Sequence, residues 1–118
     1  QIAGVACDHW NRYVEDIKLI KKLGVNSYRL SLEWSKIEPE KGKIDQNIIN
    51  HYHSVIDELI KNNIDPVITL HHFTDPIWFH EIGAFEKKKN IRQIFTDSSI
   101  FVGWRSPISF NIYWPPLG

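Results

Sequence analysis

Two short stretches of the 118-residue sequence place residues that could do chemistry close to the ends of predicted strands. The first stretch contains Arg29 and Glu33, and the second contains the adjacent histidines His71 and His72, followed by Phe73. A carboxylate can transfer protons or act as a nucleophile, and a histidine can hydrogen-bond a hydroxyl group. An aromatic ring beside such a histidine suits a sugar, which has apolar C–H faces and a rim of hydroxyl groups. These residue types favour a carbohydrate site.

Each of these polar residues also has a structural explanation. A buried arginine needs an acidic partner, because an unpaired buried charge is very costly. Arg29 could therefore form an internal ion pair with Glu33 or with a neighbouring strand, or it could lower the pKa of a catalytic carboxylate that another strand supplies. His71 and His72 point to opposite faces of an extended segment, so only one of them can face the site. Either could be a hydrogen-bonded structural histidine.

The elements that must position these residues alternate between helix and strand. Apolar residues at helical spacing predict amphipathic helices over residues 8–24 and 45–61. Residues 25–34 alternate between apolar and polar side chains, which predicts a strand, and residues 36–42 contain Pro and Gly, which predict a loop. Residues 67–73 begin with a short apolar run, typical of a parallel strand buried on both faces.

This order predicts an α/β fold with a parallel sheet. The carboxyl ends of parallel strands meet at one edge of the sheet, so we expect Glu33 and Trp34 to lie near His71 and His72. Since both faces of such a strand are covered, the polar face that carries Arg29 is expected to be buried rather than solvated.

The motifs, taken in order, resemble one enzyme family. Residues 8–42, "DHWNRYVEDIKLIKKLGVNSYRLSLEWSKIEPEKG", resemble the glycoside hydrolase family 1 segment in which a D-H-[YW]-x-R-Y-x-x-D-[IV] helix leads to Y-R-[FL]-S-[IL]-x-W at the second barrel strand. Residues 51–79, "HYHSVIDELIKNNIDPVITLHHFTDPIWF", resemble the next helix and the third-strand motif, commonly L-x-H-W-[DT]-x-P. The resemblance implies a partial (β/α)8 barrel, comprising helix 1, strand 2, helix 2 and strand 3, from an enzyme that hydrolyses β-glycosides with retention.

Individual residue roles follow from this resemblance. Arg29 matches the arginine that neighbours the catalytic nucleophile of the family, and His72 matches the histidine that hydrogen-bonds the sugar in the cleavage subsite. Phe73 takes the place of the Trp that follows this histidine, so it lacks the indole N–H but keeps a stacking surface. Trp34 matches the Trp that closes the strand-two motif, where we expect it to pack.

The sequence lacks both catalytic carboxylates of the family, which stand in an N-E-P motif on the fourth strand and an E-N-G motif on the seventh. A complete barrel needs roughly 250 residues. We therefore expect residues 1–92 to be a partial barrel, an N-terminal piece of a retaining β-glycosidase that is inactive alone. Residues 93–118 match the family poorly, as a frameshift, a missed splice or an internal deletion would leave them. The alternatives are a noncatalytic product that binds sugar or associates through strand edges, and an unrelated barrel enzyme.

Composition argues against several other classes of function. Fourteen basic residues balance fourteen acidic ones, so no bulk charge indicates a nucleic-acid or membrane partner, and no apolar run is long enough to span a membrane. The single cysteine, Cys7, fits a reducing compartment, and we expect a cytoplasmic protein. His51 and His53 have no carboxylate or thiol at a recognisable ligand spacing, so we expect no metal. The expected partner is a small-molecule β-glycoside, with no cofactor, and the oligomeric state is left open.

Overall fold

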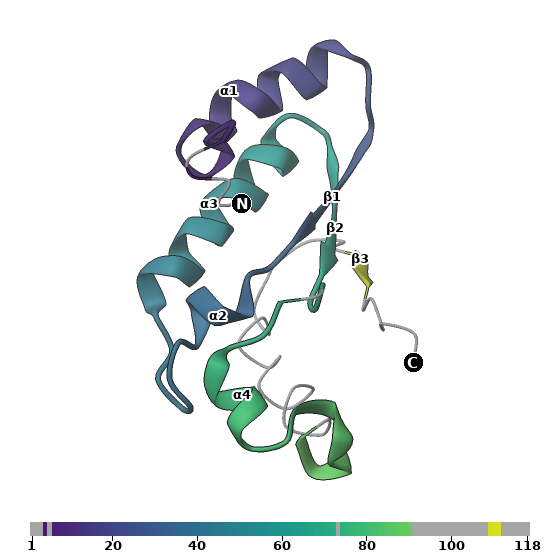
Figure 1. Cartoon of the computed structure of the whole chain (residues 1–118). Coiled ribbons are helices and arrows are strands. Elements are labelled where there is room, and N and C mark those ends of the chain that lie inside the picture. Colours follow the sequence, from purple (N-terminus) through teal and green to yellow (C-terminus); the bar gives the residue numbers. More distant parts are fainter. Residues whose placement is uncertain (1–3, 5, 73, 91–108, 112–118) are drawn as a thin grey trace.

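The computed structural model describes residue 4 and residues 6–72, 74–90 and 109–111. Its elements in chain order are α1 (His9–Lys22), β1 (Ser27–Ser31), α2 (Trp34–Ile37), α3 (Gln46–Lys61), β2 (Asp65–Thr69), α4 (Ile77–Glu81), the 3-10 helix η1 (Ala84–Glu86) and β3 (Ser109–Asn111). Figure 1 shows α1 and α3 side by side next to the strands, with α4 beyond the carboxyl end of β2. The order helix, strand, helix, strand that the sequence predicts is confirmed.

The three strands form one parallel sheet in the order β1, β2, β3. Ser27 pairs with Asp65 and Ser31 pairs with Thr69, so β1 and β2 end at the same level. The helix α3 makes the crossover connection that two parallel strands require. The third strand, β3, was not predicted from the sequence.

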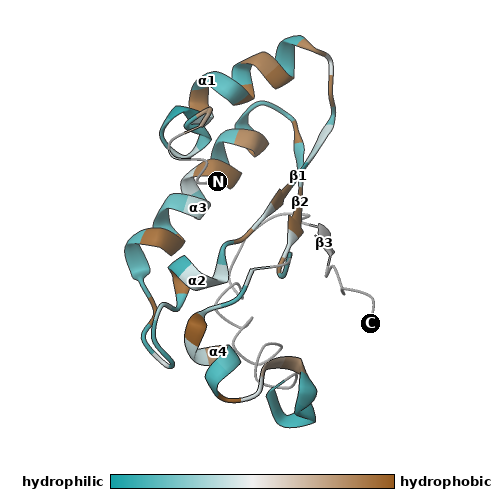
Figure 2. Ribbon diagram, in the orientation of Figure 1, coloured by the Kyte–Doolittle hydropathy of each residue, from teal (hydrophilic) through white to brown (hydrophobic). Residues whose placement is uncertain are grey.

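The core lies between the strands and the helices α1 and α3. The apolar stripe of α3 buries Ile49, Tyr52, Val55, Ile56 and Leu59. These side chains pack with fully buried residues of the other elements, namely Ile17 of α1 and Ile68 of β2. Figure 2 shows hydrophobic residues along β1 and β2, and hydrophobic turns that alternate with hydrophilic ones on α1 and α3. No helix within the described ranges is long and apolar enough to cross a membrane.

A side-chain cap fixes where α3 begins. Asp45 precedes the helix, and its Oδ1 accepts a hydrogen bond from the N–H of Asn47 at 3.0 Å. A side-chain acceptor at this position satisfies one of the N–H groups that the first helical turn leaves without an intrahelical partner.

The first strand is shorter than its alternating pattern predicts. β1 ends at Ser31, and Trp34 begins α2 instead of ending the strand, so the predicted boundary between strand 25–34 and loop 36–42 is wrong. Beyond β1 the N–H of Glu33 donates to the Tyr52 hydroxyl at 2.9 Å, away from β2. The apolar pattern of the sequence nevertheless extends to Trp34. The Trp34 ring is packed against Phe79 of α4 and not against the sheet.

Candidate functional site

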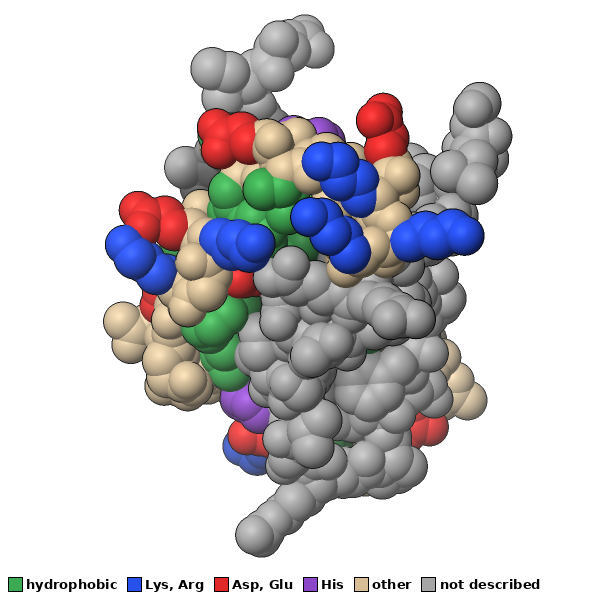
Figure 3. Space-filling model, turned by 90° about the horizontal axis from the view of Figure 1, so that it is seen from below, with side chains coloured by type: hydrophobic (Ala, Val, Ile, Leu, Met, Phe, Trp, Pro, Cys, Tyr) green, Lys and Arg blue, Asp and Glu red, His purple; other side chains and the backbone are tan. Residues whose placement is uncertain are grey.

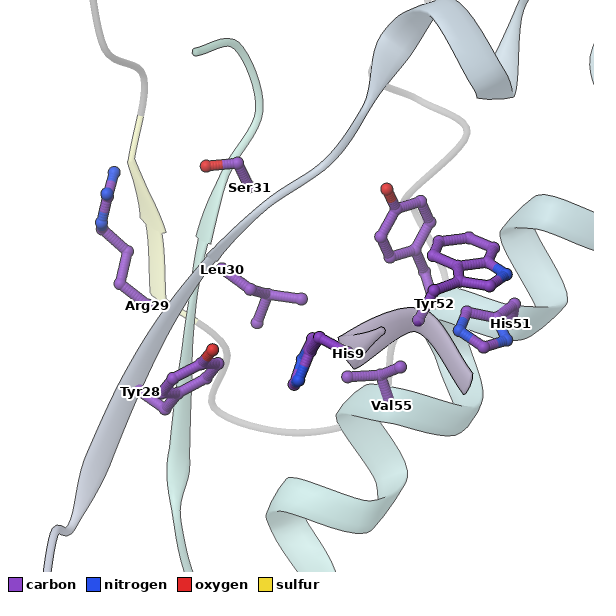
Figure 4. Close-up of a pocket in the computed structure, with 9 residues that line it drawn as sticks. His9, Tyr28, Arg29, Leu30, Ser31, His51, Tyr52 and Val55 are labelled. Carbon is purple, nitrogen blue, oxygen red and sulfur yellow. The ribbon is translucent and has the colours of Figure 1, made fainter. Parts of the chain in front are cut away.

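Polar side chains gather on the face of the sheet that turns away from α1 and α3. Alternate side chains of a strand point to opposite faces, so Arg29 and Ser31 lie on this face while Tyr28 and Leu30 point toward the helices (Figure 4). The Arg29 Nη1 donates a hydrogen bond to the Thr69 Oγ1 at 3.3 Å, which links β1 to β2 on the same face.

The histidine His72 reaches the same face from the segment that follows β2. Its Nδ1 lies 3.4 Å from the Ser31 Oγ. Arg29 and His72, two of the residues to which the family motifs assign a role, therefore lie on one side of the sheet. Phe73, the predicted stacking residue, lies outside the described residues.

The predicted burial of Arg29 is wrong for this structure. Its side chain is exposed, and among the described residues it forms no ion pair. The prediction assumed that both faces of the strand are covered, whereas the described helices α1 and α3 cover only the face opposite Arg29. Its suggested effect on a catalytic carboxylate stays a prediction.

The carboxylate of Glu33 ties the end of β1 to the segment after β2. Its Oε1 accepts a hydrogen bond from the Ser35 hydroxyl at 2.6 Å, and its Oε2 accepts one from the Thr74 hydroxyl at 3.0 Å. Glu33 is thus held by hydroxyl groups and not by Arg29, so the predicted pair between the two is wrong. Burial raises the pKa of Tyr52, which accepts from the Glu33 N–H, because burial disfavours the phenolate.

His71 points away from His72 and is a structural histidine. Its Nε2 lies 2.6 Å from the Asp75 Oδ1, and the two side chains are only 6% and 7% exposed. The ring also packs edge-on against Phe85, with centroids 5.0 Å apart. Asp75 was missed in the sequence, because no periodic pattern marks a contact between two residues of an irregular segment.

A buried glutamate, also missed in the sequence, organises the loop after α2. Glu38 is 1% exposed, and its carboxylate accepts hydrogen bonds from the Trp34 indole N–H at 2.9 Å and from the Gly42 N–H at 2.8 Å. Its backbone carbonyl accepts from the Trp78 indole N–H at 2.9 Å. Trp34 packs as expected, and Trp78 uses its indole N–H for this structural contact.

A pocket of about 280 Å³ lies between β1 and the helices α1 and α3 (Figure 4). Its walls include both faces of β1, from Tyr28 to Ser31, together with His9, Trp10, His51, Tyr52 and Val55. One edge of β1 pairs with β2, and the structure describes no strand beside its other edge.

The histidine His51 belongs to this helix-side pocket and not to the polar face. Its ring stacks on Trp10, with centroids 3.7 Å apart, and meets Tyr13 edge-on at 5.2 Å. Burial lowers the pKa of His51, because it disfavours the charged imidazolium. The Nε2 atom is buried and has no hydrogen-bond partner among the described groups.

The lysines at positions 87–89 are exposed. Figure 3, which views the molecule from below, shows Lys and Arg side chains gathered on that face with acidic side chains around them. Such a mixed, solvated surface agrees with the balanced net charge.

Comparison with known proteins decides the family of this α/β unit. The family model described as glycosyl hydrolase family 1 matches residues 1–106. The chain belongs to glycosyl hydrolase family 1. A 6-phospho-beta-galactosidase of Clostridium acetobutylicum is 40% identical over 87 residues, which are 73% of this chain and 18% of that protein.

Solved structures agree with this family membership. A beta-glucosidase from Exiguobacterium marinum superposes with a TM-score of 0.86 and 32% identity over 95% of this chain and 26% of its own. A beta-glucosidase from Thermotoga maritima in complex with methoxycarbonyl-substituted glucoimidazole superposes with a TM-score of 0.72 and 37% identity over 79% of this chain and 21% of its own. The chain thus spans about a fifth to a quarter of the length of these family 1 relatives.

Proposed function

We propose that this chain forms part of the sugar site of a retaining β-glycosidase, and that it contains the second and third strands of a (β/α)8 barrel. The observation that carries the proposal is the shared polar face, where Arg29 contacts Thr69 and His72 contacts Ser31 at the carboxyl ends of adjacent parallel strands. In α/β barrels the loops at this end of the strands carry the active site. The whole enzyme would act on β-glucosides, β-galactosides or their 6-phosphates.

In this proposal each residue contributes to binding or to electrostatics, and none attacks the substrate. Retaining hydrolysis needs a general acid/base and a nucleophile, both carboxylates, roughly 5 to 5.5 Å apart. His72 would hydrogen-bond a sugar hydroxyl, and Phe73 would stack on the sugar. Arg29 would lie beside the nucleophile and favour its charged form. Neither the N-E-P nor the E-N-G motif occurs in this sequence, so other parts of the enzyme would supply both carboxylates.

Glu33 does not fit the role of a catalytic carboxylate. Both of its oxygens accept hydrogen bonds from the hydroxyls of Ser35 and Thr74, which stabilise its present position. A single carboxylate also cannot serve as both nucleophile and acid/base. We therefore propose that Glu33 supports the site without taking part in bond cleavage.

The proposal can be tested in a grafted enzyme. Residues 8–90 of this chain would replace the segment of the Exiguobacterium marinum beta-glucosidase on which they superpose, so that the host supplies the missing strands and carboxylates. We expect the grafted enzyme to hydrolyse an aryl β-glucoside. A folded grafted enzyme that has lost all activity, while the host remains active, would contradict the proposal.

A second candidate function is noncatalytic association through β1. The structure describes no strand beside the outer edge of β1. Unpaired backbone groups on an exposed edge are a template for another strand. Sedimentation of the 118-residue chain tests this candidate, because an Arg29→Pro substitution would remove one edge N–H and should reduce any association.

A further inference from the structure

The segment that presents His72 is irregular, and side chains hold it in place. β2 ends at Thr69 and α4 begins at Ile77. Between them, the Thr74 N–H donates to the His72 carbonyl at 2.9 Å, and the Pro76 carbonyl accepts from the Phe79 N–H at 3.0 Å. Because the segment lies outside the helices and strands, side-chain contacts contribute to its fixed geometry.

The strongest of these contacts is made by Asp75. Its Oδ1 lies 2.6 Å from the His71 Nε2, a short distance that is typical of a charge-assisted hydrogen bond. Its Oδ2 lies 3.3 Å from the Nε2 of His80, whose side chain is 63% exposed. The buried His71 therefore fixes the position of the Asp75 carboxylate, and the exposed His80 contacts the carboxylate from the solvent side.

The His71 ring is fixed on a second side by the layer of α4 and η1. Phe85 contacts it edge-on at 5.0 Å, and Phe85 in turn contacts Phe79, which is 1% exposed. His71 and His72 are consecutive and point in opposite directions, one to this layer and the other to Ser31. A fixed His71 ring therefore restrains the backbone at the adjacent residue, His72, and with it the direction of the His72 side chain.

We propose that Asp75 is a positioning residue of the sugar site, acting through His71 to set the orientation of His72. The inference rests on the proposed function, because His72 matters only if it contacts the substrate. A shift of about 1 Å in a substrate-positioning group can lower a rate by about 100-fold. Replacement of Asp75 should thus affect kcat more than KM, as expected when contacts that strengthen in the transition state are misaligned.

The test compares variants of the grafted enzyme with an aryl β-glucoside. Asp75→Ala removes the acceptor for His71, and we expect a loss of about 10- to 100-fold in kcat/KM, mostly in kcat. Asp75→Asn keeps an acceptor oxygen and should recover most of that loss. His71→Phe removes the other partner of the same bond and should behave like Asp75→Ala.

Two controls separate positioning from general destabilisation. Asp45→Ala removes the N-cap of α3, far from the site, so it should lower the melting temperature and leave kcat/KM unchanged. His80→Gln alters the exposed contact of Asp75 and leaves the Asp75–His71 bond in place, so it should also leave kcat/KM unchanged. If Asp75→Ala changes the melting temperature but not kcat/KM, the positioning role is refuted.

The outcomes also separate this inference from the proposed function. If His72→Ala has no effect in an active grafted enzyme, the proposed sugar contact fails. If His72→Ala lowers kcat/KM and Asp75→Ala does not, only the positioning role fails. If the graft of residues 8–90 does not fold, a smaller graft of residues 69–86 carries His71, His72, Asp75 and Phe85 into the same host for the same comparison.

Discussion

Substitution of Glu38 should destabilise the protein more than that of any exposed carboxylate. Glu38→Ala leaves two donors without their acceptor, the Trp34 indole N–H and the Gly42 N–H. A buried donor left unsatisfied costs about 1–3 kcal/mol. Gly42 is exposed, so its N–H can bind water once the loop relaxes, and the total should lie near 2–3 kcal/mol. Glu38→Gln keeps one acceptor oxygen, and we expect about half of that loss.

The assay is urea unfolding of the grafted enzyme, with tryptophan fluorescence as the probe of the transition. The matched control is Glu40→Ala, two residues further along. Among the described residues, Glu40 forms its ion pair with Lys43, and both side chains are more than half exposed. An exposed pair contributes about 0–1 kcal/mol. The unfolding midpoint should therefore fall in the order parent, Glu40→Ala, Glu38→Gln, Glu38→Ala. Equal midpoints for Glu38→Ala and Glu40→Ala would refute the reasoning.

Two further predictions concern pH and catalysis. The pKa of His51 in the folded protein lies below its ordinary value of 6.5. As the pH falls, the unfolded chain therefore binds a proton at this residue before the folded protein does, and the free energy of unfolding should decrease below about pH 6.5. His51→Phe keeps a ring on Trp10 and should reduce this decrease, measured as the change in unfolding midpoint between about pH 7.5 and 5; an unchanged decrease would contradict the assigned cause. The purified 118-residue chain should not hydrolyse an aryl β-glucoside, because it lacks both carboxylate motifs; turnover that Glu33→Gln abolishes would show that the role given to Glu33 is wrong.

The sequence predicts those elements whose signals are local. The apolar stripe of α3 predicts that helix within one residue of its observed start, and the short apolar run after Pro66 predicts β2. The alternation before Trp34 is misleading, because the alternation of apolar and polar residues continues after the chain has left the sheet at Ser31. There the apolar ring packs on α4, and period alone cannot distinguish a strand from such a turn.

The contacts that shape the site depend on the fold, so residue patterns could not reveal them. The bond between His71 and Asp75 needs the geometry of an irregular segment, and the link from Glu33 to Thr74 joins residues 41 positions apart. The burial of Arg29 was predicted from the assumption of two covered faces, but only one face is covered by the described helices. The family motifs assigned Arg29 and His72 to one sugar site, which periodicity alone would not have done.

The most direct test of the central claim is the kcat/KM of His72→Ala in the grafted enzyme. One buried sugar contact left unmade costs about 1–3 kcal/mol, which corresponds to a loss of about 5- to 150-fold in kcat/KM. The matched control is His53→Ala, which removes a histidine from α3 on the helix side of the sheet and should retain the parent value. A loss in this range for His72→Ala, with most of it in kcat, is the result that our account predicts. An unchanged kcat/KM for His72→Ala in a folded, active grafted enzyme would contradict it.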